Sequence, residues 1–167
     1  MRRTAAALLP LALAGCMDDS TPAAAPGATL DPVAFFAGRS MGEGTLDLLV
    51  GKSEQIRVRS LGRRDGNGGL VLVQEIRQGD NAPRRRSWTL RPNGAGRYTG
   101  ELTDARGPVD VEVAGGLARI RYTMKNGMAV DQTLALQPDG RTLRNSFNVR
   151  KFGIQVARLD EVIRKLD

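Results

Sequence analysis

Residues 109–124 read VDVEVAGGLARIRYTM, which are two runs of alternating side chains joined by a Gly-Gly pair. In the first run, valines alternate with Asp110 and Glu112. In the second, apolar residues alternate with Arg119 and Arg121. Strict alternation puts one face of a strand in a core and the other in water, as in antiparallel sheets. The stretch therefore predicts a β-hairpin, and the rest of the fold can be worked out from it.

The same alternation extends on both sides of this hairpin, and short turn sequences interrupt it at regular intervals. About nine short strands joined by tight turns form an antiparallel meander. Closing such a meander on itself buries one face and removes both open edges. We therefore predict an all-β, antiparallel up-and-down barrel of about 8–10 strands. A two-sheet sandwich is the alternative, but it usually needs a long crossing connection. The turn sequences are Asp65-Gly66-Asn67-Gly68, Gly79-Asp80-Asn81, Pro92-Asn93-Gly94, Asn126-Gly127 and Pro138-Asp139-Gly140.

Two short helices are expected at the ends of this domain. Residues 31–38 carry an aspartate cap, a proline at the first helical position and a closing glycine, which predicts a short N-terminal helix. Residues 158–167 place four apolar side chains on one helical stripe, which favours a short C-terminal helix on the sheet. A last strand is the alternative for this segment.

The N-terminus has the pattern of a secretory signal. Arg2 and Arg3 precede an apolar run that is shorter than the roughly 20 residues of a membrane span. The run ends in Leu13-Ala14-Gly15-Cys16, which resembles the bacterial lipobox and implies a diacylglycerol on Cys16. We predict a lipoprotein signal peptide over residues 1–15, a flexible tether over 16–30 and a single barrel domain over 31–167. A plain secretory signal that contains a cysteine is the alternative.

This N-terminus also indicates where the protein lies and what it meets. Met17, rather than an aspartate, follows the anchor cysteine, which favours the outer membrane over the inner membrane on the periplasmic side. The chain has 25 Lys and Arg against 18 Asp and Glu, a net charge of +7. For an anchored protein the matching partner is an anionic lipid headgroup, at about 1 kcal/mol per basic residue. An ordinary solvated face is the alternative, and the secretion signal argues against nucleic acid.

The composition removes several kinds of catalytic site. The chain has no histidine and a single cysteine, so zinc sites of the usual type, Ser-His-Asp triads and Cys-His pairs are not available. No glycine-rich stretch opens a helix after a strand, as a phosphate-binding loop requires. We therefore expect no catalytic residues, no metal, no cofactor and no enzymatic activity.

Several polar residues fall on inward positions when the alternation is followed along each strand. A small barrel filled by side chains seldom buries four such groups, whereas a barrel with a cavity accommodates them. Arg86 would be the partner of an anionic head. In the alternative, Glu75 pairs with Arg86 inside, Gln132 bonds Asn145, and the tyrosines are wall residues. The cavity candidates are Glu75, Arg86, Trp88, Tyr98, Gln132 and Asn145.

A series of short motifs follows the lipobox in a characteristic order. The first is F-x-G-x-x-x-G-x-G, made by Phe36, Gly38, Gly42 and Gly44. Then come Glu75, Arg86-Ser87-Trp88, Tyr98-Thr99-Gly100, Asn145 and Lys151-Phe152-Gly153. In this order they resemble the uncharacterised bacterial lipoprotein family DUF3833 over nearly all of residues 30–157. The resemblance implies a lipocalin-like or calycin-like barrel of unassigned activity, in which the first and last motifs are structural. It also implies a link to genes of membrane fatty-acid modification, which is an association only.

These observations favour a membrane-anchored periplasmic lipoprotein that binds a small apolar or amphipathic ligand, such as a fatty acid or lipid, with a role in envelope lipid homeostasis. One alternative is an interaction module that uses its arginine-rich outer surface, including Arg84, Arg85 and Arg91. Another is a lipid-directed enzyme that uses Glu75 with Arg86.

Overall fold

The computed structural model describes residues 21–167. The predicted signal peptide, Cys16 and the start of the predicted tether lie outside these residues. The described chain forms one short helix and ten strands: α1 (Pro32–Phe36), β1 (Gly38–Leu48), β2 (Glu54–Arg64), β3 (Leu70–Gln78), β4 (Arg84–Pro92), β5 (Arg97–Leu102), β6 (Val109–Ala114), β7 (Leu117–Thr123), β8 (Ala129–Leu136), β9 (Thr142–Lys151) and β10 (Ile154–Lys165).

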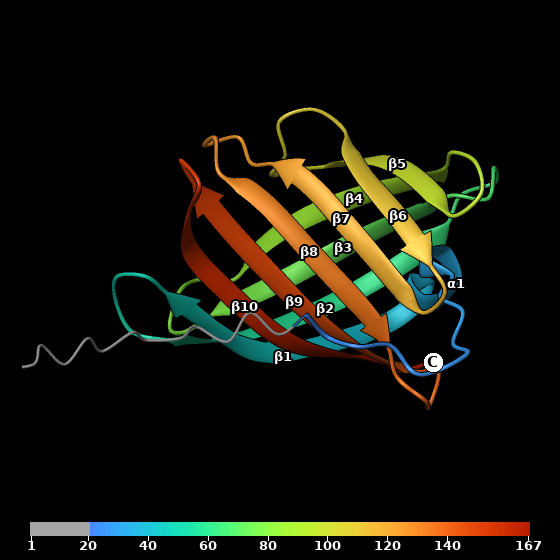
Figure 1. Cartoon of the computed structure of the whole chain (residues 1–167), viewed down its shortest axis with the longest axis horizontal. Helices are drawn as coiled ribbons and strands as arrows, with labels where there is room; N and C mark the ends of the chain where they lie inside the picture. The colour runs from blue at the N-terminus through green and yellow to red at the C-terminus, as the bar shows by residue number, and fades with distance from the viewer. Residues whose placement is uncertain (1–20) are drawn as a thin grey trace, which may run out of the picture.

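The ten strands close into one antiparallel barrel (Figure 1). Each strand pairs with its neighbours in sequence, and β1 pairs with β10, with Leu46 opposite Leu159. The hairpin at residues 109–124 becomes β6 and β7, with Val111 opposite Ile120. The predicted all-β up-and-down barrel is thus confirmed, because this order leaves no sheet edge and needs no crossing connection.

The predicted C-terminal helix is wrong, since this segment is β10. It pairs with β1 on one side and β9 on the other, and these two ladders close the barrel. Leu159, Glu161 and Ile163 are alternate residues of β10, and all three line the barrel interior. Glu161, the middle one of these three, is charged in the sequence and so hides the alternation of a strand. The apolar residues that remain happen to be spaced as on one face of a helix.

One end of the barrel is covered by α1, and we call it the closed end. Asp31 Oδ1 accepts hydrogen bonds from the backbone N–H of Val33 (2.9 Å) and Ala34 (3.0 Å), which caps the helix start. The side chains of Val33 and Phe35 are buried in the main apolar cluster. Gly38, with a φ of 93°, turns the chain from the helix into β1.

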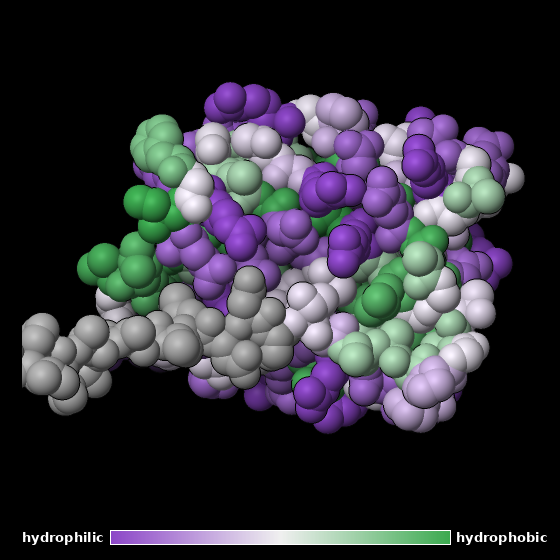
Figure 2. Space-filling view, viewed as in Figure 1, coloured by the Kyte–Doolittle hydropathy of each residue, from purple (hydrophilic) through white to green (hydrophobic). Residues whose placement is uncertain are grey.

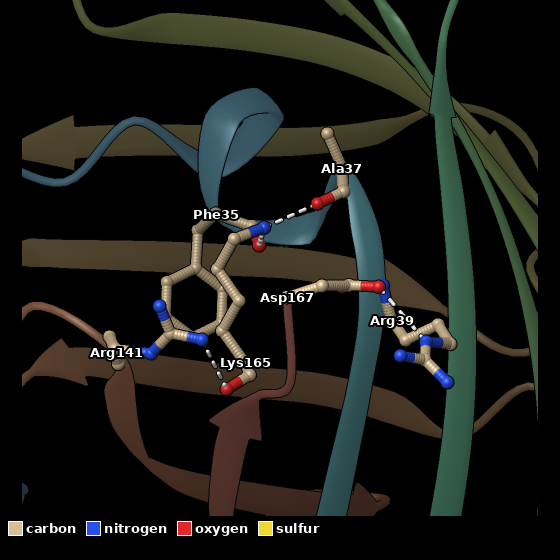
Figure 3. Close-up of polar contacts among 6 residues, drawn as sticks. All are labelled: Phe35, Ala37, Arg39, Arg141, Lys165 and Asp167. Atoms are coloured by element: carbon tan, nitrogen blue, oxygen red, sulfur yellow. Dashed lines mark hydrogen bonds and ion pairs between the residues drawn. The ribbon is translucent and has the colours of Figure 1, made fainter.

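The C-terminus of the chain holds this helix in place (Figure 3). Lys165 Nζ donates to the carbonyl of Phe35 (2.9 Å) and to that of Ala37. Asp167 pairs with Arg39, with 2.9 Å between its Oδ2 and Arg39 Nε. The Lys165 bonds satisfy carbonyls at the end of α1 that the helix itself leaves without a partner, and the Asp167–Arg39 pair joins the C-terminus to the start of β1.

The opposite end, which we call the mouth, is formed by the loops 49–53, 79–83, 103–108, 124–128 and 152–153. No helix covers it in the described chain. The main apolar cluster includes the side chains beneath α1 and extends along β5 to β9 as far as Ala105 and Val149 near the mouth, while a small second cluster of Ile56, Val58 and Ile76 lies on β2 and β3.

The described part of the predicted tether is not free of the barrel. The backbone N–H of Ala25 donates to the carbonyl of Leu136 (2.9 Å), and that of Leu30 donates to the carbonyl of Gly115 (2.9 Å). Leu30 is buried in the main cluster. The prediction of a flexible tether up to residue 30 therefore fails over these residues.

Within residues 21–167, no helix is long and apolar enough to cross a membrane.

Candidate functional site

The barrel interior contains two chambers. The outer chamber has a volume of about 520 Å³ and is lined toward the mouth by residues such as Leu48, Met124 and Met128. The inner chamber is about 70 Å³ and lies beneath α1, where Pro32 and Phe36 line it. Four residues line both chambers: Val58, Arg86, Gln132 and Glu161. The boundary between the chambers is therefore largely polar.

We call the side chains at this boundary the polar layer, which consists of Gln74, Arg86, Gln132, Asn145 and Glu161. They come from β3, β4, β8, β9 and β10, and all of them line one or both chambers. Strand register puts Gln74 opposite Arg86 and Asn145 opposite Glu161. Two groups of polar side chains, one on β3 and β4 and one on β8 to β10, thus face the same interior space.

The first group is organised by Gln74. Its Oε1 accepts hydrogen bonds from Arg86 Nε (2.8 Å) and from Trp88 Nε1 (2.9 Å), and its Nε2 donates to Ser60 Oγ (3.0 Å). The Arg86 guanidinium also lies over the Trp88 ring, 5.5 Å from the ring centroid. Tyr122 packs edge-on against the same ring, with 5.9 Å between centroids. These contacts fix the guanidinium on an aromatic wall.

The second group is a chain of hydrogen bonds that ends at Glu161. Gln132 Nε2 donates to Asn145 Oδ1 (3.0 Å), and Asn145 Nδ2 donates to Glu161 Oε2 (2.7 Å). The predicted bond between Gln132 and Asn145 is therefore present. The carboxyl needs the glycine at position 42, because a Cβ there would lie 1.8 Å from Glu161 Oε1. A Cβ on Gly44 would lie 2.2 Å from the carbonyl oxygen of Asp160.

Burial acts in opposite directions on the two ionisable groups of the layer. It raises the pKa of Glu161 and so favours the neutral acid, while the bond from Asn145 and the charge of Arg86 oppose this shift. It also lowers the pKa of Arg86, although a guanidinium stays charged in proteins. Burial raises the pKa of Tyr122, and the charge of Arg86 opposes this shift. The layer thus holds one persistent positive charge and a carboxyl whose pKa is raised by burial.

Within residues 21–167, no carboxylate lies within ion-pair distance of Arg86. Gln132 Oε1 is also buried and accepts no hydrogen bond from the described chain. Buried polar atoms normally have a partner, and a half-buried charge such as that of Arg86 is more favourable beside a counter-ion. An anion at Arg86 and a hydrogen-bond donor at Gln132 would complete the layer.

Four of the predicted cavity residues line the chambers: Arg86, Trp88, Gln132 and Asn145. Glu75 does not. It lies on the outer face of β3 and contacts Arg77, with 3.8 Å between Oε1 and Nε, so the predicted inward position and its pairing with Arg86 are wrong. Both faces of β3 carry apolar residues, and only pairing with β4 decides which face is inside.

Tyr98 also lines neither chamber. It is half-buried at the closed end, opposite Val111, where burial and the negative charge of Asp31 raise its pKa. The arginines proposed for an outer surface behave differently from one another. Arg84 lines the outer chamber near the mouth and reaches Asp104 (3.0 Å between Nη1 and Oδ2), so its predicted place on the outer surface is wrong. Arg85 and Arg91 are exposed on the outer face.

Two members of the polar layer were not predicted, Gln74 and Glu161. Gln74 was missed because of the same error on β3 that placed Glu75 inside. Glu161 was missed because its segment was interpreted as a helix. The spacing of Gly42 and Gly44 was the available signal, since alternate glycines on one strand leave room for bulky groups on the next. Among residues 21–167, no cluster of three or more Asp, Glu, His or Cys side chains could hold a metal ion.

The chain belongs to the DUF3833 family, because the family model described as "Protein of unknown function (DUF3833)" matches residues 10–165. No curated protein matches the chain. Among solved structures it is similar to one described as "Structure of S-type Phycobiliprotein Lyase CPES from Guillardia theta". The TM-score is 0.61 at 6% sequence identity, covering 81% of this chain and 91% of that chain. At this identity the similarity shows the fold, a lipocalin-like barrel.

Proposed function

We propose that this DUF3833 member is a membrane-anchored binding protein of the bacterial envelope, which holds one small amphipathic anion of the fatty-acid or lipid class. The observation that carries the proposal is Arg86, a cation that faces both chambers with no carboxylate partner in the described chain. Arg86 is half-buried, and its contacts with Gln74 and the Trp88 ring leave its charge without a counter-ion in the described chain. Removing a charge from water without a counter-ion is costly, and a bound anion would offset that cost.

The head of the ligand would lie at the polar layer. A carboxylate or phosphate oxygen would accept charge-assisted hydrogen bonds from the Arg86 guanidinium, whose Nε is already held by Gln74 at 2.8 Å. A hydroxyl on the head, or a protonated acid, could donate to Gln132 Oε1, which is buried without a partner. Glu161 lies on the same boundary, and its neutral form would not repel the anion.

The tail of the ligand would occupy the outer chamber. Its volume of about 520 Å³ lies within the range of roughly 300–1,000 Å³ found for small-molecule sites. The inner chamber, at about 70 Å³, is too small for an acyl chain. The ligand would therefore bind with its head deep in the barrel and its tail toward the mouth. The apolar wall of the outer chamber includes Leu46, Leu48, Ile56, Ile76, Phe147, Val149, Val156 and Leu159.

The envelope location rests on the sequence. The lipobox-like ending at Cys16 supports a diacylglycerol anchor on the periplasmic side, with the outer membrane favoured by Met17. An anchored protein that binds a fatty acid or lipid would serve envelope lipid homeostasis.

The test is titration calorimetry of the protein with a long-chain fatty acid and with the alcohol of the same chain length. The acid should bind more tightly than the alcohol, and Arg86→Gln should weaken the acid by about 10- to 100-fold, the worth of a charged hydrogen bond. Arg91→Gln, on the exposed outer face of the same strand, is the matched control and should bind as the wild type does. Equal affinities for Arg86→Gln and wild type would reject the site.

A second candidate is an enzyme, and Glu161 is the observation that favours it. A buried carboxyl of raised pKa beside an arginine is a common arrangement of a general acid, and the similar barrel from Guillardia theta is named a lyase. Glu75, the carboxylate that the sequence suggests for an enzyme, lies on the outer face of β3 and does not line either chamber. If this candidate holds, recovered ligand should be chemically changed by wild type and unchanged by Glu161→Gln, as mass spectrometry would show.

A further inference from the structure

The mouth carries four exposed apolar side chains on two neighbouring loops. Leu49 and Val50 follow β1, with 53% and 85% of their surface exposed, and Phe152 and Ile154 lie at the β9–β10 turn, with 94% and 61% exposed. The two loops are neighbours because β1 pairs with β10, and the Leu49 N–H donates to the carbonyl of Val156 at 2.9 Å. Figure 2 shows apolar residues gathered at the left edge, where Figure 1 places these loops.

Phe152 is the most unusual of the four. Its φ is 51°, and within residues 21–167 no other residue except glycine has a positive φ. The left-handed conformation costs a side chain such as phenylalanine roughly 1–2 kcal/mol. The ring is almost fully exposed, and the one ring contact recorded for it within residues 21–167 is with the neighbouring Lys151, so its burial contributes almost nothing to the fold. The ring therefore indicates a partner outside the chain.

The charges beside the apolar tips indicate what that partner is. Lys52 follows Leu49 and Val50, and Lys151 precedes Phe152, with its Nζ 5.8 Å from the ring centroid. Within residues 21–167 neither lysine forms an ion pair. Apolar tips flanked by unpaired lysines match a bilayer surface with anionic headgroups, since the rings and aliphatic side chains enter the acyl boundary and the ammonium groups meet the phosphates.

The path of the N-terminal segment agrees with this partner. From Ala25, which bonds β8 at the closed end, the chain runs back along the outer wall. Thr21 shares a surface groove that extends from Ser146 at the middle of β9 to Arg150 near the mouth. Only four residues lie between Cys16 and Thr21, and the five residue steps from one to the other span at most about 18 Å. A lipid on Cys16 would thus hold the mouth half of the barrel near the bilayer.

We propose that the mouth docks onto an anionic bilayer through Leu49, Val50, Phe152 and Ile154, so that the outer chamber opens into the lipid rather than into water. The docking goes beyond the proposed ligand site and holds whether or not the chamber is filled. It also gives the Lys151-Phe152-Gly153 motif a role outside the barrel's own stability.

The experiment uses the full chain with Cys16→Ser, in which an introduced cysteine is the only thiol. Phe152→Cys carries an environment-sensitive fluorophore at the mouth, and Val73→Cys carries it at an exposed apolar position on the outer wall. Each protein is mixed with vesicles of phosphatidylcholine and phosphatidylglycerol, some of which contain a quencher attached to the acyl chains. Sedimentation measures how much protein is bound.

The proposal expects bound protein in which the label at position 152 shifts to the blue and is quenched, while the label at position 73 keeps its spectrum in buffer. It is overturned if the chain does not bind these vesicles, if neither label responds, or if the label at position 73 responds as strongly as the one at 152. The last result would instead place the outer wall on the membrane. Since no ligand is added, these outcomes do not depend on the affinity of the chamber.

Discussion

The two ends of the barrel are made from the same ten strands but are finished in opposite ways. At the closed end α1 covers the opening, Phe35 is buried, and Lys165 donates to the last carbonyls of the helix. At the mouth five loops surround a chamber of about 520 Å³, and Phe152 and Val50 are almost fully exposed. At the closed end the apolar side chains are buried and stabilise the fold, whereas at the mouth they are exposed and available for a partner.

The polar layer lies where these two halves meet. Toward the closed end the space left is about 70 Å³, and toward the mouth it is more than seven times as large. A molecule that enters from the mouth passes Arg84 and then meets Arg86 and Glu161 before it reaches the inner chamber. A ligand would therefore enter at the mouth, and the polar layer would bound the outer chamber on its inner side.

The largest effect is expected when the same large side chain is placed in each half of the barrel, which tests whether the two chambers differ in free space. Ala118, which is fully buried at the inner chamber, leaves no room, so Ala118→Phe should destabilise the fold by about 1–3 kcal/mol or more. Ala157→Phe projects into the outer chamber and should cost less than about 1 kcal/mol. It should nevertheless weaken fatty-acid binding about tenfold or more, because the ring displaces several methylenes worth about 0.8 kcal/mol each. Urea denaturation and calorimetry measure the two effects; equal destabilisation by both variants would contradict the two-chamber description.

The next test removes a charge from each end. Lys165→Met leaves the carbonyls of Phe35 and Ala37 without their donor and should lower the free energy of unfolding by about 1–3 kcal/mol. Lys52→Met at the mouth should change it by less than about 0.5 kcal/mol. Thermal denaturation of both variants checks the pair. If the two melting temperatures fell together, the C-terminal contacts would not be what holds α1.

The polar layer itself should make stability depend on pH. Because the folded-state pKa of Glu161 is raised, the folded chain keeps a proton that the unfolded chain releases above its ordinary pKa near 4.5. The folded state binds more protons in this range, so the free energy of unfolding decreases as the pH rises above that value, until the pH passes the folded-state pKa. Glu161→Gln should remove this contribution. Denaturation of both proteins across this range isolates it, and parallel pH profiles would show that Glu161 is not buried as described.

The smallest effect is expected at the tip of the mouth. Phe152→Ser removes a ring that is 94% exposed, so the free energy of unfolding should change by no more than about 0.5 kcal/mol. Phe35→Ser at the closed end, by contrast, removes a buried ring and should cost several times as much, about 3–5 kcal/mol for the loss of a packed aromatic side chain. A strong loss of stability in Phe152→Ser would mean that the turn serves the fold rather than a partner.

The sequence was sufficient for the barrel, because period-two alternation and turn residues repeat from β1 to β9. It was sufficient for Arg86, Trp88, Gln132 and Asn145, since each lies on a strand with one clearly apolar face. It failed on β3, where Leu70 and Leu72 compete with Val71 and Val73 for the inner face and only the pairing with β4 decides. It failed again on β10, because a buried carboxyl looks like a solvent-facing residue until its partners Asn145 and Gly42 are known.

The central claim is that the outer chamber holds an anion at Arg86, and native mass spectrometry with lipid extraction of the protein purified from bacterial envelopes tests it most directly. The account predicts one fatty acid or anionic lipid per chain in the wild type and in Arg91→Gln, and its loss in Arg86→Gln. A bare mass for the wild type, repeated after incubation with a lipid extract, or equal occupancy in the two arginine variants, would contradict it.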